Sequence, residues 1–369
     1  MVRRLILLFA STALGVLLAC GVALAAVSAT PDPGTVDASG QVSAILRLGD
    51  RVYLGGKFNH VNGEPRARLA AIDAATGELT DWNPGADGEV RALAASSDGT
   101  RIFAGGEFTE VGGEAHGRLA AIDAESGSVD AAWDPQADRT VRSLAVSGDR
   151  VYLGGDFTQV DGQVRQRLAM VDAATGELDA NWLPAADDRV RKLSVYGDPA
   201  RVYVGGDFSQ ISGRPRHHLA ALGFGRGLPS KWQPNPRRPV LDFALTRTRV
   251  FTAQGGTNGG AVVVYGLGTG SRAWAVRGNG DVNAVTTYAN RVYVGGHFTN
   301  LGGKARHGLA ALDPRRGALD LTWRPRVGPP DKAEVWELTR DVADRRLYVG
   351  GEFTEVSGET HKRFARFSG

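Results

Sequence analysis

Apolar residues fall in short runs that tight polar turns separate. One run, Val-x-x-Leu, opens at residues 42–46 and is followed by the turn Gly49-Asp50. The next run carries the phrase Tyr/Phe-x-Gly-Gly, and a further run reads Leu-Ala-Ala-Ile-Asp at residues 69–73. Short apolar runs joined by such turns are typical of antiparallel β-strands. Because the first runs are apolar at both alternating positions, we expect them to be buried on both faces.

The double-glycine phrase returns at a nearly constant spacing. Its copies begin at Gly55, Gly105, Gly154, Gly205, Gly255, Gly295 and Gly350. Each interval has room for four strands, the last of which ends on a tryptophan and a proline such as Trp82 and Pro84. A period of about 50 residues with four short strands is the signature of a β-propeller blade. The sequence predicts an all-β fold, a seven-bladed β-propeller of four-stranded antiparallel blades, as a single domain over residues 26–369.

The two ends of this array are expected to meet. The last copy stops after its third strand, at residues 364–367. A missing fourth strand would leave an open sheet edge. We therefore predict that the N-terminal segment 26–33 pairs with the C-terminal strands, so that an N-terminal strand closes the ring.

The fifth copy is damaged. The step from Gly255 to Gly295 is about ten residues shorter than the steps before it, and the Phe-Thr sequence after the double glycine is lost. The fifth blade, about 240–281, is therefore predicted to be shortened and to leave a notch on one face of the ring. A notch beside polar loops is a natural place for a ligand.

Residues 1–25 have the features of an export signal. Arg3 and Arg4 precede an uncharged run from Leu5, and Ala23-Leu24-Ala25 offers a cleavage site. Two alternatives stay open: Leu17-Leu18-Ala19-Cys20 resembles a lipoprotein signal that would acylate Cys20, and the uncharged run is long enough to remain as a membrane anchor. Each alternative predicts a secreted or cell-surface protein that contacts a membrane only through this segment.

Charge and cysteine content narrow the class of partner. The formal net charge is +3, which falls to +1 once Arg3 and Arg4 are removed. A charge near zero argues against a nucleic-acid-binding protein. Cys20 is the only cysteine, so the folded part has no disulfide and must be held by packing. We expect a monomer.

The repeat resembles a known family. Its successive phrases are Gly-Gly-x-Phe-Thr-x-Val-x-Gly, Arg-x-Arg-Leu-Ala-x-Ile-Asp-x-x-Thr-Gly and Asp-x-x-Trp-x-Pro, spread over residues 42–369. This combination is similar to the delta-sixty repeat, a bacterial β-propeller repeat of unassigned function. The resemblance implies an exported or cell-surface propeller and carries over no catalytic residue. The chain departs from the family by tryptophan in place of phenylalanine and by its degenerate fifth repeat.

Basic residues align when the repeats are measured from the double glycine. Eleven residues after its first glycine stand Arg66, His116, Arg165, Arg216, Arg306 and His361. The connection that carries them joins the second and third strands, so they are predicted to share one face of the propeller. Arginine suits the capture of carboxylates or phosphates. The competing interpretation is that a residue repeated in every blade pairs with a carboxylate in every blade, either Asp73, Asp123, Asp172 and Asp313, or Glu107, Asp156, Asp207 and Glu352.

Residues that vary between blades are the better candidates for ligand binding. Arg91, Arg142 and Arg191 occupy the second position of the first strand, near the mouth of the predicted channel. His297 takes the place of an acidic residue after the double glycine, beside the shortened blade. The histidines are scattered over different blades, so neither a metal site nor a cofactor site is predicted.

These features favour a binding or scaffold module, for an anionic glycan or a protein partner on the long-loop face. The alternative is an extracellular lyase or hydrolase with its site at the channel mouth near the fifth blade. No carboxylate pair or Ser/His/Asp set is confined to one blade, which disfavours the enzyme. A purely structural role that uses the short turns of the opposite face is the third possibility.

Overall fold

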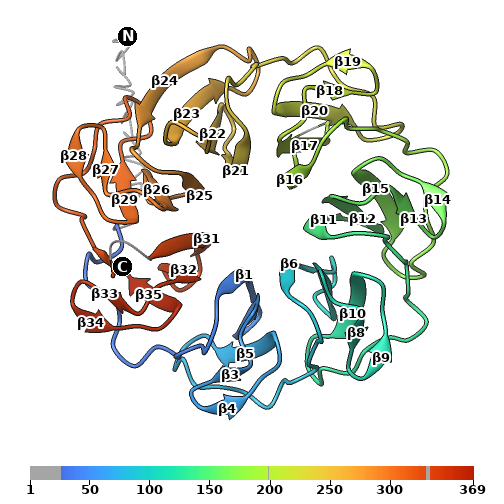
Figure 1. Ribbon diagram of the computed structural model, residues 1–369, viewed down its shortest axis with the longest axis horizontal. Coiled ribbons are helices and arrows are strands. Elements are labelled where there is room, and N and C mark those ends of the chain that lie inside the picture. Colours follow the sequence, from blue (N-terminus) through green and yellow to red (C-terminus); the bar gives the residue numbers. More distant parts are fainter. Residues whose placement is uncertain (1–25, 198, 330–332) are drawn as a thin grey trace, which may run out of the picture.

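The computed structural model describes residues 26–197, 199–329 and 333–369, and over these the chain is built from β-strands arranged in a ring (Figure 1). The predicted export signal, the acylation of Cys20 and the membrane anchor all lie outside the described residues. Within the described ranges no helix is long and apolar enough to cross a membrane.

Each sheet of the ring presents its first strand to the centre and its later strands outward (Figure 1). We number these sheets 1 to 7 along the chain. Their strands are β1 (Val42–Leu48), β2 (Arg51–Gly56) and β5 (Leu69–Asp73); β6 (Val90–Ala95), β7 (Arg101–Gly106) and β10 (Leu119–Asp123); β11 (Val141–Ser147), β12 (Arg150–Gly155) and β15 (Leu168–Asp172); β16 (Val190–Tyr196), β17 (Arg201–Gly206) and β20 (Leu219–Gly223); β21 (Val240–Leu245), β22 (Arg249–Gln254), β23 (Ala261–Gly266) and β24 (Arg272–Arg277); β25 (Val282–Tyr288), β26 (Arg291–Gly296) and β29 (Leu309–Leu312); β31 (Glu334–Asp341), β32 (Arg346–Glu352) and β35 (Phe364–Ser368).

Four strands form a full ladder only in sheet 5, among the residues described. In sheet 1 the predicted fourth strand is reduced to one bridge, between Ile72 and Leu79. Beyond it the chain turns away from the sheet at Trp82 and Pro84. Proline has no N–H to offer a ladder, and the Trp82 indole N–H donates to the carbonyl of Asp123 in sheet 2 (3.0 Å). The outer segment therefore joins neighbouring sheets rather than extending its own.

Short hairpins fill most connections between the second and third strands, and the sequence did not predict them. They are β3 (His60–Val61) with β4 (Glu64–Pro65), β8 (Glu110–Val111) with β9 (Glu114–Ala115), β13 (Gln159–Val160) with β14 (Gln163–Val164), β18 (Gln210–Ile211) with β19 (Arg214–Pro215), β27 (Asn300–Leu301) with β28 (Lys304–Ala305), and β33 (Glu355–Val356) with β34 (Glu359–Thr360). The strand β30 (Val327–Gly328) pairs with β33. The described connection from β22 to β23 has no such hairpin. We call the face that carries the hairpins the long-loop face, and the opposite face the turn face.

A β-bulge interrupts every inner strand at the same place. In β1, Val42 lies opposite Gly56 and Ala44 lies opposite Gly55, so Ser43 is an extra residue. The shift recurs in β6, β11, β16, β21, β25 and β31. A bulge re-aims the side chains around it. In six of the seven sheets two glycines lie opposite the bulge, and a Cβ at Gly56, for example, would collide with the carbonyl oxygen of Gln41. In sheet 5 the same positions hold Ala253 and Gln254. This close approach is the crowding that the double glycine predicted.

The core lies between neighbouring sheets rather than within one. Phe103 of sheet 2, for example, packs against Trp133 with ring centroids 4.9 Å apart, in a cluster that also holds Phe157 of sheet 3. At the junction of the two ends, the N–H of Ser28 donates to the carbonyl of Ser368 (2.7 Å) and the N–H of Asp32 donates to that of Arg366 (2.6 Å). The segment 26–33 therefore lies beside β35 with two backbone hydrogen bonds, without forming a regular strand.

Candidate functional site

The bulges bring two successive residues of six inner strands, and one residue of β25, to the central channel. There they surround a small polar cavity of about 170 Å³. The bulge residues that line it are Ser43, Ala44, Arg91, Ala92, Arg142, Ser143, Arg191, Lys192, Leu241, Asp242, Asn283, Trp336 and Glu337. The framework of the sheets repeats, but these side chains differ from sheet to sheet. The channel lining therefore departs from the symmetry of the sheets.

Arg91, Arg142 and Arg191 lie in this cavity, and each is paired with a carboxylate. Arg142 Nε and Nη2 donate to the two oxygens of Asp156 (2.9 and 2.7 Å). Arg191 binds Asp207 in the same bidentate way (2.8 and 2.9 Å). A guanidinium that is already neutralised in this geometry attracts an external anion less.

The third arginine is also neutralised. Arg91 donates to Glu107 (2.9 Å) and lies 2.6 Å from a carboxylate oxygen of Glu89. The carboxylates respond to their partners: burial raises the pKa of Asp156, but hydrogen bonds from Arg142 and Arg189 outweigh it and hold that pKa below its ordinary value. The double-glycine acids are therefore the partners of the channel arginines.

A charged cluster that the sequence did not reveal lies deeper in the channel. Lys192 Nζ is 3.2 Å from Asp242 Oδ1 and 4.0 Å from Glu337 Oε2. The three come from sheets 4, 5 and 7. Asp242 Oδ2 accepts from the N–H of Val285 (2.8 Å), while its buried Oδ1 has no hydrogen bond of good geometry among the described residues.

Burial and charge set the protonation of this cluster. Burial raises the pKa of Glu337 to about 7, with Lys192 opposing the rise and Asp242 adding to it. The carboxylates of Asp242 and Glu337 raise the pKa of Lys192, so the ammonium stays charged. The channel therefore holds one carboxyl group that exchanges its proton near neutral pH. Each of these residues occurs once, at a position where other repeats have alanine or serine. A charged residue at an otherwise small position is the sequence signal that could have revealed them.

Trp336 is the one channel residue with a large exposed apolar surface among those described. Its relative exposure is 38%, whereas five tryptophans of the outer segments are between 0 and 9% exposed, namely Trp82, Trp133, Trp182, Trp232 and Trp323. Those tryptophans donate their indole N–H to the next sheet, as Trp133 does to the carbonyl of Asp172 (3.1 Å). Trp336 instead shares the channel mouth with Leu241 and Asn283. Packing between sheets does not account for it.

The repeated basic positions are occupied by residues that hold the loops. Arg165 is 6% exposed and donates to the carbonyls of Val164 (2.9 Å) and Asp179 (3.0 Å). Arg66, Arg216 and Arg306 repeat both contacts at the equivalent residues. Burial lowers the pKa of Arg165 below its ordinary value. Backbone carbonyls, rather than the carboxylates considered from the sequence, are the partners of these arginines.

The two histidines at the same position are also buried. His116 Nδ1 lies 3.2 Å from a carboxylate oxygen of Asp134, and His361 Nδ1 is 2.8 Å from the hydroxyl of Thr35. Burial lowers the pKa of His361. These contacts account for the ring of repeated basic residues without a ligand. The aspartates of the outer turns accept from their own backbone, as Asp73 does from the N–H of Thr76 (2.7 Å).

His297 stands apart from both sets. It is exposed at the end of β26, on the channel side of sheet 6 next to Glu334. Burial raises the pKa of Glu334, while a hydrogen bond from Asn283 and the charge of His297 oppose the rise. Within the described part of the chain no three His, Asp or Glu side chains are placed to hold a metal ion together.

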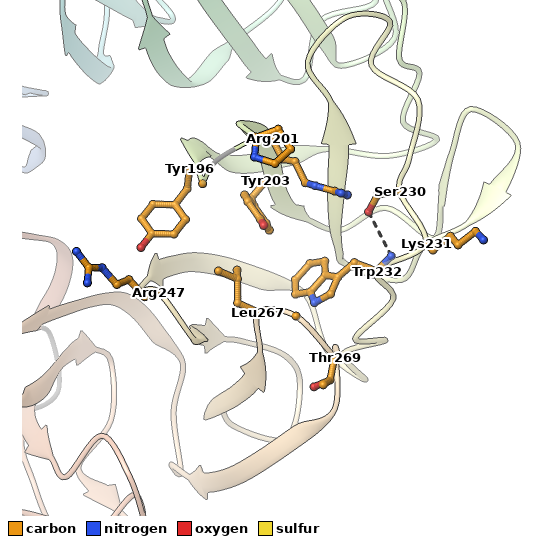
Figure 2. A pocket seen from close by; sticks show the side chains of 12 residues that line it. Tyr196, Arg201, Tyr203, Ser230, Lys231, Trp232, Arg247, Leu267 and Thr269 are labelled. Carbon is orange, nitrogen blue, oxygen red and sulfur yellow. Dashed lines mark hydrogen bonds between the residues drawn. The ribbon is translucent and has the colours of Figure 1, made fainter.

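A wider cavity of about 990 Å³ opens on the turn face between sheets 4 and 5 (Figure 2). Tyr196, Tyr203 and Trp232 form its aromatic wall, and Arg201 and Arg247 also line it (Figure 2). At five other junctions the first arginine of the second strand closes the seam by donating to a turn carbonyl of the next sheet.

Arg51 shows this closing contact, because its guanidinium donates to the carbonyl of Glu125 (2.7 Å). Arg150 does the same to Phe224 (3.3 Å). Among the described residues Arg201 makes no such bond, and Arg291 binds the Asp320 side chain of its own sheet instead (2.6 Å).

Comparison with known proteins identifies the fold. The family model described as "Outer membrane protein assembly factor BamB" matches residues 49–206, less than half of the chain, and the "Domain of unknown function (DUF5122) beta-propeller" matches residues 343–368. No curated protein matches the chain. Among many similar solved structures, the WD40 beta propeller domain of Doa1 superposes with a TM-score of 0.61 at 13% identity, over 93% of this chain and 95% of that one. The chain is an all-β protein with a β-propeller fold.

Proposed function

We propose that the protein is an exported, envelope-associated binding propeller whose channel mouth takes an uncharged glycan. The export-type segment before residue 26 and the printed description of the family matched over residues 49–206 both support an envelope location. The proposal includes a ring of seven blades of the delta-sixty type, closed by the segment 26–33. The repeated motif and the hydrogen bonds of that segment to β35 support it.

The exposed indole of Trp336 carries the proposal. An aromatic face at the mouth of a polar channel offers a sugar ring an apolar surface to stack on. Asn283, Lys192 and Asp242 supply hydrogen-bonding groups below it. Because Arg91, Arg142 and Arg191 already bind carboxylates, the ligand at this site is uncharged rather than anionic. The cavity of about 170 Å³ admits the end of a glycan rather than a long segment.

Calorimetric titration of the full chain with chitotriose, cellotriose and maltotriose tests this site. At least one of them should bind, Trp336→Ala should weaken that binding by about tenfold or more, and Trp336→Phe should retain part of it. Leu321→Ala removes an exposed apolar residue from the outer rim and should leave the affinity unchanged. Unaltered binding by Trp336→Ala, or failure of every glycan to bind, would rule out the channel mouth as the site.

Glu337 supports a second candidate function, cleavage of the bound glycan. A carboxyl group with a pKa of about 7 has the protonation that a general acid needs near neutral pH. Incubation with the same glycans would then release new reducing ends, and Glu337→Gln would abolish the release. Glycans that bind and stay intact would leave binding as the function.

A further inference from the structure

A second cationic site lies on the outer rim of sheet 6, on the long-loop face beside β28 (Figure 1). Its cavity measures about 610 Å³. Lys304, Arg306 and His307 line it from the hairpin side, and Arg324 and Arg326 line it from the segment that follows Trp323. We call these five residues and the space between them the rim groove. It is remote from the channel and shares none of its residues.

The rim groove lacks the carboxylates that neutralise the channel. Its described lining contains no aspartate or glutamate. Lys304, Arg324 and Arg326 are exposed, and none of them lies within 4.0 Å of a carboxylate in the part of the chain that the structure describes. Clustered like charges repel one another, so an anion that enters the groove gains attraction without first displacing an internal partner.

The other repeats show that this composition is not required by the fold. Where sheet 6 has Lys304, sheets 1, 2 and 7 have glutamate, as Glu64 in sheet 1. The residue after the outer tryptophan is Arg324 here but Asn83, Asp134, Leu183 or Gln233 elsewhere. Since the same backbone is built with neutral or acidic residues in those sheets, packing alone does not explain Lys304 and Arg324.

The floor of the groove is anchored by hydrogen bonds, whereas its walls are exposed. The guanidinium of Arg306 is anchored to the carbonyls of Ala305 (2.7 Å) and Asp320 (3.1 Å). His307 Nδ1 is buried without a hydrogen-bond partner among the described residues. Burial, with a contribution from the charge of Arg326, lowers the pKa of His307. A buried ring nitrogen without a partner beside two exposed guanidinium groups is suited to an oxygen-rich ligand.

We propose that the rim groove binds phosphoryl groups. Tetrahedral oxyanions accept hydrogen bonds from several directions at once, which matches donors that approach from the hairpin and from the outer segment. Guanidinium groups bind such anions through paired N–H donors. Phosphoryl groups occur in soluble phosphate polymers and in lipid headgroups, and the groove would recognise the same chemistry in both.

Calorimetric titration of the full chain with sodium tripolyphosphate, and co-sedimentation with phosphatidylcholine vesicles containing phosphatidylglycerol, separate the two sources. Tripolyphosphate binding identifies a soluble phosphate ligand, and binding to the vesicles alone identifies the lipid headgroup. In either case the double variant Arg324→Gln/Arg326→Gln should weaken binding by about tenfold or more.

The double variant Arg315→Gln/Arg316→Gln is the matched control. It removes the same charge from the turn on the opposite face of sheet 6, and it should leave the affinity unchanged. Equal weakening by both double variants would mean diffuse attraction and would overturn the proposal. Binding of citrate as tight as that of tripolyphosphate would overturn the phosphate class, and absence of binding to both probes would overturn the site.

Discussion

At the scale of single residues, the partner of an arginine decides its role in this propeller. Arg165 is buried and satisfied by backbone carbonyls, so it holds a loop. Arg142 is paired with Asp156, so its charge is neutralised and it can offer a ligand only hydrogen bonds. Arg324 has no carboxylate within 4.0 Å among the described residues and keeps its full charge. The same side chain is structural, neutralised or available for a ligand according to what surrounds it.

Glu337 makes the stability of the folded chain depend on pH. Its pKa is about 7 in the folded state and near its ordinary value of 4.5 when the chain is unfolded, so the folded state binds the proton more tightly. The resulting stabilisation is complete below about pH 4.5 and is lost as the pH rises to about 7. Glu337→Gln keeps the shape without the charge. It should raise the free energy of unfolding at pH 8 by roughly 2 kcal/mol and should have little effect at pH 5.

Urea denaturation at the two pH values measures this difference. Glu110→Gln, which changes an exposed glutamate in β8, should alter stability equally at both. A Glu337→Gln chain that keeps the wild-type slope between pH 5 and 8 would show that another group carries the pH dependence.

At the scale of the strand, the bulge and the double glycine form one device. The bulge on the inner strand pushes a backbone carbonyl toward the second glycine, and the first glycine lies against the inner strand of the next sheet. The two glycines therefore serve different contacts, one within a sheet and one between sheets. Because of the bulge, the side chains of Arg191 and Lys192 both face the channel. In a strand without a bulge, these two neighbouring side chains would lie on opposite faces of the sheet.

Alanine at the two glycines of sheet 4 should separate these contacts. A Cβ at Gly206 would collide with the backbone carbonyl oxygen of Arg189. A Cβ at Gly205 would meet side-chain atoms, with Val240 Cγ1 at 2.8 Å. Gly206→Ala should lower the free energy of unfolding by more than about 3 kcal/mol, and Gly205→Ala by about 1 to 3 kcal/mol. Thermal melts of both variants would contradict this account if their order were reversed.

The strand pattern shows how much of the fold can be predicted from the sequence. It predicts residues 69–73 as a strand, and β5 has these bounds. The hairpins and bulges escape it, because two-residue strands and a single extra residue leave no periodicity. The spacing of the repeats aligns the basic candidate residues, but it does not predict which groups they bind in the folded chain. Lys192, Asp242 and Glu337 are far apart along the chain and meet only because three inner strands place them at one depth in the channel.

At the scale of the whole molecule, the contact between the two ends of the chain affects the stability of the entire ring of sheets. Each sheet packs against two neighbours, so a ring that is open at one junction exposes the faces on both sides of it. At the proposed closure Asp32 binds Arg366 (2.7 Å) and Ser368 (2.5 Å), and the indole of Trp323 donates to the carbonyl of Ser28 (2.8 Å). Val27 is buried in the same cluster as Tyr293 and Phe367. The segment thus joins the outer part of sheet 6 to the last strand of sheet 7.

Removal of this segment should destabilise the ring. A chain that begins at residue 34 loses the backbone hydrogen bonds to β35, leaves the buried Arg366 without Asp32 and uncovers the apolar surface around Val27. Its free energy of unfolding should fall by about 3 to 5 kcal/mol relative to a chain that begins at residue 26. The uncovered edge of β35 should also pair with another copy, because an unpaired strand edge is a template for association. Urea denaturation with light scattering measures both effects, and a monomer of unchanged stability would show that the ring closes without this segment.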